Sequence, residues 1–153
     1  MERNRSFGNN ILTYSIQIPQ AYIKVKEIDT RLGNVILYSN PTRTLLYAEV
    51  SGYISLGLLK QDLAFVYDFD QSQTQPWTYL MNTAQIRFAH PLNPFYLNHL
   101  KNNNHLKHYI VYIPSPVLRF INRVFGSLIP IDQMLKSEQE LLTILNEHVL
   151  LKD

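Results

Sequence analysis

Three histidines in the middle of the chain have a spacing that suits a metal ion. His99, His105 and His108 form the pattern H-x5-H-x2-H, and imidazole is a common ligand of zinc and nickel. A complete site usually adds a carboxylate, but residues 71–131 contain no Asp or Glu. We therefore interpret these histidines as solvated loop residues and expect neither a metal nor a cofactor.

Two carboxylates, Asp68 and Asp70, form a D-x-D triplet of the kind that binds a divalent cation. The triplet lies between a predicted helix and a loop rich in Gln and Ser, where solvated carboxylates are common. Acids at the C-terminal end of a helix oppose its dipole. A solvated pair is the favoured interpretation, and a functional pair is the alternative.

The sequence lacks the motifs that position a nucleophile or a phosphate. It contains no G-x-S-x-G, no G-x-x-x-x-G-K and no G-x-G-x-x-G. Because there is no Cys, thiol nucleophiles, thiolate metal sites and disulfides are excluded. We assign no catalytic residue and predict that the chain is not an enzyme; a small hydrolase without a recognisable motif is a third alternative.

Two arginines have a spacing that suits an anion. Arg119 and Arg123 are four residues apart on a helix predicted from Pro116 to Gly126, so they share one face. A bound phosphate or an acidic partner would relieve the repulsion between them. We expect the arginines on the exposed side and the apolar residues on the side of the core. Those apolar residues are Val117, Phe120, Ile121 and Val124.

The charges are distributed unevenly along the chain. The net charge of +2 combines a neutral segment 1–70, a segment 71–131 with five bases and no acid, and an acidic segment 132–153. The middle segment favours a positive face that binds an acidic partner, with Lys101 and Lys107 beside the two arginines. A polar surface built from Asn and Gln is the alternative. The small net charge argues against nucleic-acid binding.

The composition predicts one folded domain. The chain has 153 residues, 46% of them hydrophobic and 17% charged, which is enough for a packed core. The first residues precede no apolar segment of a secretory signal, and no apolar run approaches the roughly 18 residues of a membrane span. We expect a cytoplasmic protein with no membrane span.

The pattern of apolar residues predicts an α/β layered sandwich. Residues 1–10 are expected to be mobile, residues 11–29 to form an edge strand or arm, and residues 30–148 to form the core. The order β-β-α-β-α-β-α-β-α calls for a mixed sheet with helices packed on it. The predicted strands are 35–38, 45–50, 77–81, 108–113 and 128–131, and the predicted helices are 55–67, 93–100, 116–126 and 137–148.

The first predicted helix has an unusually wide apolar arc. Only Gly57, Lys60, Gln61, Ala64 and Asp68 are left for solvent. One side of the arc would face the sheet. The other would face a neighbouring helix, the arm Ile11–Ile18, or a second copy of the chain in a homodimer through Leu56–Val66.

The order of elements and certain residues resemble the anti-sigma-factor-antagonist (STAS) family in its SpoIIAA-like form. The resemblance covers residues 30–148. It depends on Gly52 before a long helix, on Asn82-Thr83-Ala84 and Ile86-Arg87-Phe88 after a strand, and on the series from Val111 to Leu145. It implies a regulatory domain that binds another protein. The position that accepts phosphate in some members falls on Pro91, which has no hydroxyl, so the phospho-switch is expected to be absent.

Two functions follow from these observations. The first is a non-enzymatic regulatory or interaction domain that binds a protein partner. The alternative is a carrier or sensor of a small apolar or lipid-like ligand, since layered folds of this type hold such ligands between helix and sheet.

Overall fold

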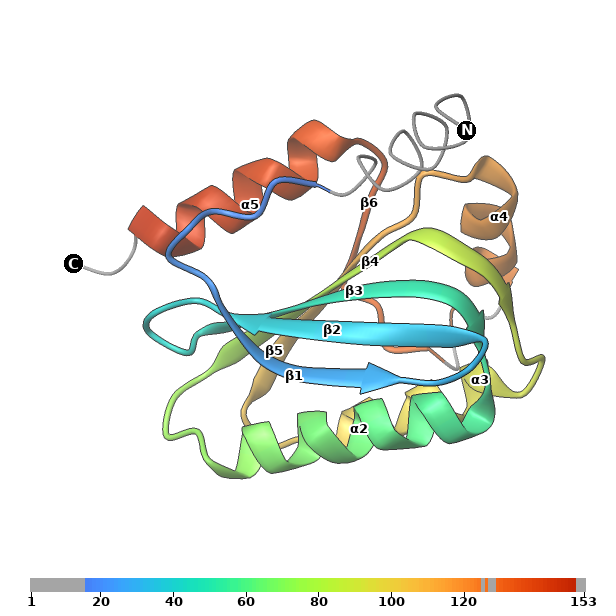
Figure 1. Ribbon diagram of the computed structural model, residues 1–153, viewed down its shortest axis with the longest axis horizontal. Helices are drawn as coiled ribbons and strands as arrows, with labels where there is room; N and C mark the ends of the chain where they lie inside the picture. Colours follow the sequence, from blue (N-terminus) through green and yellow to red (C-terminus); the bar gives the residue numbers. More distant parts are fainter. Residues whose placement is uncertain (1–15, 125, 127–128, 151–153) are drawn as a thin grey trace, which may run out of the picture.

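The computed structural model describes residues 16–124, 126 and 129–150, which form one six-stranded sheet with helices on both faces (Figure 1). The strands are β1 (Ile23–Asp29), β2 (Gly33–Ser39), β3 (Leu45–Ile54), β4 (Trp77–Ala89), β5 (Leu106–Tyr112) and β6 (Gln133–Leu135). The helices are α2 (Leu56–Gln71), α3 (Asn93–Leu97), the 3-10 helix η1 (Asn98–Asn102), α4 (Pro116–Val124) and α5 (Glu138–Leu150).

The strands lie in the sheet in the order in which they occur in the chain. The pairs β1–β2 and β2–β3 are antiparallel, and the three pairs from β3 to β6 are parallel. Each parallel pair is joined through a helical segment, as parallel strands require. The predicted α/β sandwich with a mixed sheet is confirmed, and so is the predicted order of its elements.

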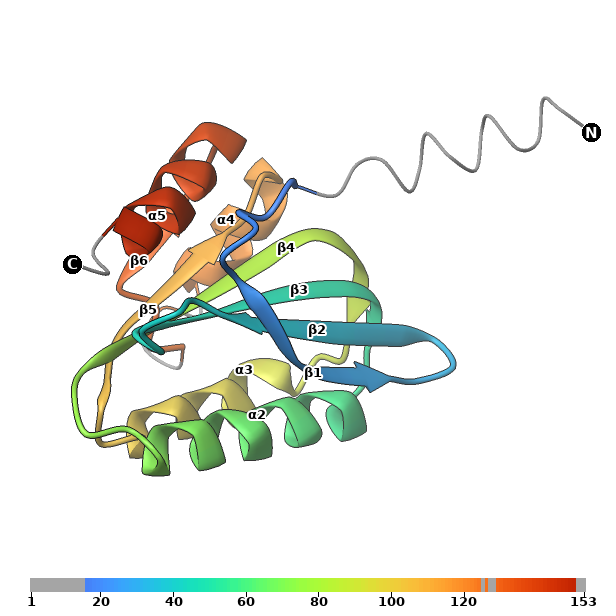
Figure 2. The ribbon, with the colours of Figure 1, turned by 60° about the vertical axis from the view of Figure 1, so that its left-hand side comes forward.

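Two apolar layers cover the sheet. Helices α2 and α3 lie below it and α5 lies above it in both views (Figures 1 and 2). Successive residues of β3 belong to opposite layers. Leu46 and Ala48 belong to the layer that contains α2, and Leu45 and Tyr47 belong to the layer that contains α5. Successive side chains on a strand point to opposite faces, so one strand supplies both layers.

The segment before β1 contributes to the layer on the α5 side. Ile16 and Tyr22 are buried there, and the Tyr22 hydroxyl donates to the Leu145 carbonyl at 2.7 Å. The hypothesis that the arm covers the first helix is therefore wrong for Ile16–Ile18. Residues 11–15, like the expected mobile residues 1–10, lie outside the described part of the chain. Strand β1 forms the expected sheet edge.

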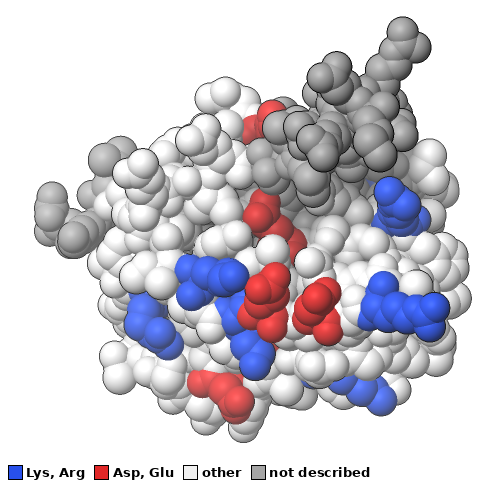
Figure 3. All heavy atoms as spheres, in the orientation of Figure 1, with Lys and Arg blue, Asp and Glu red and all other residues white. Residues whose placement is uncertain are grey.

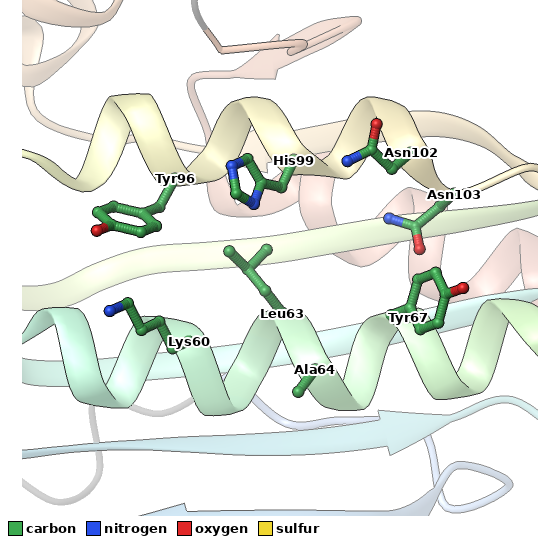
Figure 4. A pocket seen from close by; sticks show the side chains of 8 residues that line it. All are labelled: Lys60, Leu63, Ala64, Tyr67, Tyr96, His99, Asn102 and Asn103. Carbon is green, nitrogen blue, oxygen red and sulfur yellow. The ribbon is translucent and has the colours of Figure 1, made fainter.

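The wide apolar arc of α2 is covered within the chain on both sides. Leu59 and Val66 are buried in the layer below the sheet. On the other side α2 faces α3 and η1 across a shallow groove, where Lys60 Nζ lies 5.0 Å from the centre of the Tyr96 ring (Figure 4). The five residues expected to face solvent are exposed. A homodimer is thus not needed to bury the Leu56–Val66 arc.

Two central strands are longer than the sequence suggests. The prediction ended β3 before Gly52 and β4 at Met81, but β3 continues to Ile54 and β4 to Ala89. Beyond Asn82, which pairs with Tyr112 at the end of β5, β4 pairs with β3 alone. Residues 83–89 of this projecting half are exposed or half-buried, which explains why their sequence does not look like a buried strand.

The position of the last strand also differs from the prediction. The prediction of a strand at 128–131 is wrong, since β6 occupies Gln133–Leu135 and pairs with β5. Ile129 instead packs in the layer below the sheet, with the partly buried Ile131 against it. An apolar segment can be buried without being extended, and its composition does not distinguish the two cases.

The continuation of β3 depends on Gly52, which has a φ of +79°. A Cβ at this position would meet the carbonyl oxygen of Leu32, a backbone atom that cannot turn away. We expect Gly52→Ala to lower the free energy of unfolding by about 1–3 kcal/mol. The measurement is urea denaturation.

The control is Gly57→Ala in the first turn of α2, where a Cβ meets only the Ser55 hydroxyl at 3.9 Å. It should raise the stability, by up to about 1 kcal/mol. Equal effects at both positions would contradict the importance of the backbone conformation at Gly52.

Candidate functional site

A cavity of about 480 Å³ lies where the parallel strands end. Its lining comes from β2 to β5, from α2, α3 and α4, and from the segment after α4. The size is within the range of small-molecule sites, and the carboxyl ends of parallel strands are the usual place for them. Most of the lining is apolar, including Val35, Val50, Met81, Val111, Ile113 and Ile129.

The inner wall of the cavity contains a buried carboxyl group. Asp62 is 1% exposed, and the Tyr79 hydroxyl donates to its two oxygens at 3.0 and 2.9 Å. Burial raises the pKa of Asp62 to about 7, although the hydrogen bond from Tyr79 opposes the shift. Burial, reinforced by the nearby Asp62, also raises the pKa of Tyr109, which lines the same wall. The inner wall therefore holds a carboxyl group that gains or loses a proton near neutral pH.

A second polar group, Asn93, lines the cavity at the start of α3. The side chain is 6% exposed, and its Nδ2 donates to the Ile54 carbonyl at 3.2 Å. This bond fixes the orientation of the amide. The other atom, Oδ1, is buried without a hydrogen-bond partner among the described residues.

Neither residue is among the site residues predicted from the sequence. The signal for Asp62 was its position, three residues after Leu59 and four before Val66, which places a carboxylate in the apolar stripe of α2. The signal for Asn93 was weaker, because an Asn before a Pro also serves as an ordinary helix start. Burial of the amide is a tertiary effect that spacing does not reveal.

Helix α4 lies at the end of the sheet (Figure 1) and contributes part of the cavity lining. The expectation that its apolar side faces the core is wrong: Val117, Phe120 and Val124 are 67%, 65% and 64% exposed. The half-buried residues are Leu118, Arg119 and Asn122. The helix is rotated because the Arg119 guanidinium reaches inward, where its Nη1 donates to the carbonyls of Ile113 and Pro114 at 2.9 and 3.0 Å.

The four predicted basic residues are not brought together. Arg119 anchors the segment that joins β5 to α4 and is half-buried, whereas Arg123 is exposed. Lys101 lies in η1 and Lys107 at the beginning of β5, whereas α4 follows the end of that seven-residue strand. Seven residues span roughly 20 Å, so the lysines and the arginines lie at opposite ends of the sheet.

On the face seen in Figure 3, charges of both signs are mixed in a band, and most of the remaining surface is uncharged. No single-sign patch covers this side of the molecule.

Of the histidines and the D-x-D triplet, the structure brings His105 and Asp70 together, with Nδ1 3.8 Å from Oδ2. Within residues 16–124, 126 and 129–150, no three His, Asp or Glu side chains are grouped as metal ligands. The expectation that both acids are solvated is wrong for Asp70, which is fully buried. Its Oδ1 accepts from Trp77 Nε1 at 2.8 Å and from the His105 backbone N–H at 2.9 Å. Asp70 thereby ties the end of α2 to β4 and to the start of β5.

Pro91 lies exposed in the turn between β4 and α3, at the mouth of the cavity. The nearby hydroxyl of Thr83 is half-buried and donates to the Tyr112 carbonyl at 2.7 Å. No helix in the described part of the chain is long and apolar enough to cross a membrane.

Comparison with solved structures supports the fold. An uncharacterized protein of the DUF3478 family with a SpoIIAA-like fold, from Shewanella loihica PV-4, is similar with a TM-score of 0.55 and 11% identity, over 77% of this chain and 98% of that one. The anti-sigma factor antagonist SpoIIAA in its unphosphorylated form is similar with a TM-score of 0.53 and 18% identity, over 74% and 96%. No family model and no curated protein matches the chain. The likeness establishes a SpoIIAA-like fold.

The raised pKa of Asp62 predicts a pH-dependent stability. The unfolded chain releases this proton near pH 4 and the folded chain near pH 7. Between these values the folded state binds more protons, so the free energy of unfolding should fall as the pH rises, by up to about 4 kcal/mol. Burial also raises the pKa of Glu49, which adds to the same trend. Urea denaturation at pH 5 and pH 7.5 measures the change.

Asp62→Asn should remove most of this slope, because the amide oxygen still accepts from Tyr79 and does not titrate. Asp68→Asn, an exposed position on the same helix, should leave the slope intact. An unchanged slope in Asp62→Asn would show that Asp62 is ionised throughout this range.

Proposed function

We propose that this chain is a regulatory domain that binds a protein partner through the outer face of α4, defined by Val117, Phe120 and Val124. The observation that carries the proposal is the exposure of these three side chains, each above 60%. Soluble domains rarely leave adjacent large apolar side chains uncovered unless they form an interaction surface. The fold likeness to an anti-sigma factor antagonist, a protein that acts on another protein, is consistent with this function.

The apolar surface extends beyond α4. Ile121, which is 42% exposed, lies at the cavity mouth together with Phe88 at the end of β4, which is 58% exposed. Arg87 and Arg123 are exposed in the same region of the fold, and residues 71–131 contain no acid. The partner surface that fits is apolar at its centre and acidic at its rim.

Regulation by phosphorylation at the family position is not part of the proposal. Pro91 has no hydroxyl, and Thr83 uses its hydroxyl in a bond to the neighbouring strand. We also assign no catalytic residue, because Asp62 and Tyr79 are buried and hydrogen-bonded to each other.

The second candidate function is carriage or sensing of a small apolar ligand. The cavity of about 480 Å³ favours it, since a space of that size lined mainly by apolar side chains suits an apolar molecule. This candidate is independent of the outer face of α4.

Photo-crosslinking in cells tests the docking surface. With p-benzoylphenylalanine in place of Phe120, irradiation should give a covalent adduct with another protein, and adding Val124→Glu should reduce its yield at least fivefold. The control places the same group at Leu32, which is 66% exposed in the turn between β1 and β2, and should give no such adduct. An adduct with lipid, or with a second copy of the chain, would contradict the proposal.

The charge of the surface is tested with Arg123 alone, because Arg119 holds the segment before α4. Arg123→Gln should weaken binding to the crosslinked partner severalfold at low salt, and the difference should shrink toward 1 M salt as the Debye length falls to about 3 Å. Lys107→Gln, at the other end of β5, is the matched control. Equal loss in both variants would indicate a general charge effect and not a basic rim at α4.

A further inference from the structure

A groove between α2 and the segment formed by α3 and η1 lies apart from the two sites described above. Its volume is about 360 Å³, within the range of small-molecule sites, and it shares no lining residue with the larger cavity. Leu63 and Ala64 of α2 give the groove an apolar surface, and the rings of Tyr96 and Tyr67 lie toward its two ends (Figure 4). An aromatic molecule fits such a space, because aromatic rings attract one another in offset or edge-on arrangements.

The polar side chains of the groove have a hydrogen-bonding capacity that the fold does not use. Within the described part of the chain, the Lys60 ammonium, the His99 imidazole and the Asn102 amide make no hydrogen bond. The same is true, among those residues, of the hydroxyls of Tyr67 and Tyr96. Each of these five groups carries at least one N–H or O–H. A carboxylate, which only accepts hydrogen bonds, therefore finds several donors here.

The lining of the groove carries positive charge and no acid. Lys60 Nζ lies 5.0 Å from the centre of the Tyr96 ring, and the centre of the His99 ring lies 5.9 Å from the same point. The ammonium and the imidazole thus lie beside one aromatic ring, and His99 adds a second positive charge when it is protonated. None of the eight described lining residues is Asp or Glu. Asp68, which is exposed one turn after Ala64, lies outside the lining.

We propose that this groove is a binding site for a small aromatic carboxylate, which places its carboxylate between Lys60 and His99 and its ring over Leu63 and Ala64. The one permanent positive charge of the lining, that of Lys60, matches a monoanion. A dianion such as a phosphate ester would find no second permanent cation in the lining, and Asp68 would repel it. This site rests on neither of the two functions proposed above and goes beyond both.

A carboxylate and its amide test the role of the charge. Naphthalene-2-carboxylate and naphthalene-2-carboxamide have nearly the same shape, but only the first is charged. Calorimetric titration of the full chain at low salt should show that the carboxylate binds about fivefold more tightly, which corresponds to an exposed ion pair of about 1 kcal/mol. Lys60→Gln should reduce this ratio to about one and leave the affinity for the amide unchanged. Lys101→Gln, which is exposed in η1 and not part of the lining, is the matched control and should keep the ratio.

A saturated probe tests the aromatic part. Decahydronaphthalene-2-carboxylate has the same charge but no aromatic ring, so it should bind severalfold more weakly than naphthalene-2-carboxylate. Equal affinities of these two carboxylates would overturn the aromatic requirement. Equal affinities of the aromatic carboxylate and its amide for the unsubstituted protein would overturn the role of Lys60.

A blocking variant tests the location. Ala64→Phe places a large side chain in the groove and should weaken binding of both aromatic probes at least tenfold. Gln61→Phe, which is exposed on the same helix outside the lining, should leave both affinities unchanged. Equal affinities of the two variants, or no binding of the aromatic carboxylate to the unsubstituted protein, would overturn the groove as a ligand site. These outcomes are separate from the photo-crosslinking result, which tests the outer face of α4 alone.

Discussion

Burial of the central parallel strands on both faces is the constraint on which the rest of the structure depends. Every residue is buried in the segments 45–48 of β3, 77–82 of β4 and 109–112 of β5. Parallel strands of this kind need two covering layers, and the chain supplies them with α2 and α3 on one side and α5 with the segment before β1 on the other (Figure 2). The cover ends where β5 ends, at Tyr112. Beyond Tyr112, β4 still pairs with β3 but no longer with β5. The cavity and α4 occupy that end of the sheet.

The same constraint explains where the buried polar groups lie. Asp70 lies where three elements meet, and the indole N–H of Trp77 and the backbone N–H of His105 satisfy its Oδ1. Such a carboxylate stabilises one arrangement of α2 against the sheet, since any other arrangement would leave these groups unpaired. At the cavity, the Tyr79 hydroxyl donates to both oxygens of Asp62, whereas Asn93 Oδ1, like Asp70 Oδ2, has no hydrogen-bond partner among the described residues.

The sequence predicts the fold class and the order of the elements, because these depend on where apolar segments begin and end. The apolar segments 45–50, 77–81 and 108–113 and the helical segments between them are local signals, and the structure places strands and helices there in the same order. The candidate site depends on the rotation of α4 about its axis and on how deeply each side chain is buried. Neither is determined by the local sequence. Both faces of α4 carry long side chains, and the sequence cannot show that Arg119 finds two carbonyls beneath the helix while Phe120 points outward. The prediction of a basic cluster was wrong for a similar reason. Lys107 and Arg123 are close in the sequence, but most of β5 lies between them.

Helix α4 is the element at which the two proposed binding events meet. Its inner side contributes Leu118 and Ile121 to the cavity, and its outer side presents Phe120 and Val124 to solvent. A nine-residue helix with this arrangement cannot shift on one side without shifting on the other. If a ligand moves α4, the affinity for the partner must change, and by linkage the partner must change the ligand affinity by the same factor. If the cavity fills without moving α4, the two affinities are independent. The position of Arg119 decides between these cases, because its bonds to Ile113 and Pro114 hold the helix in place.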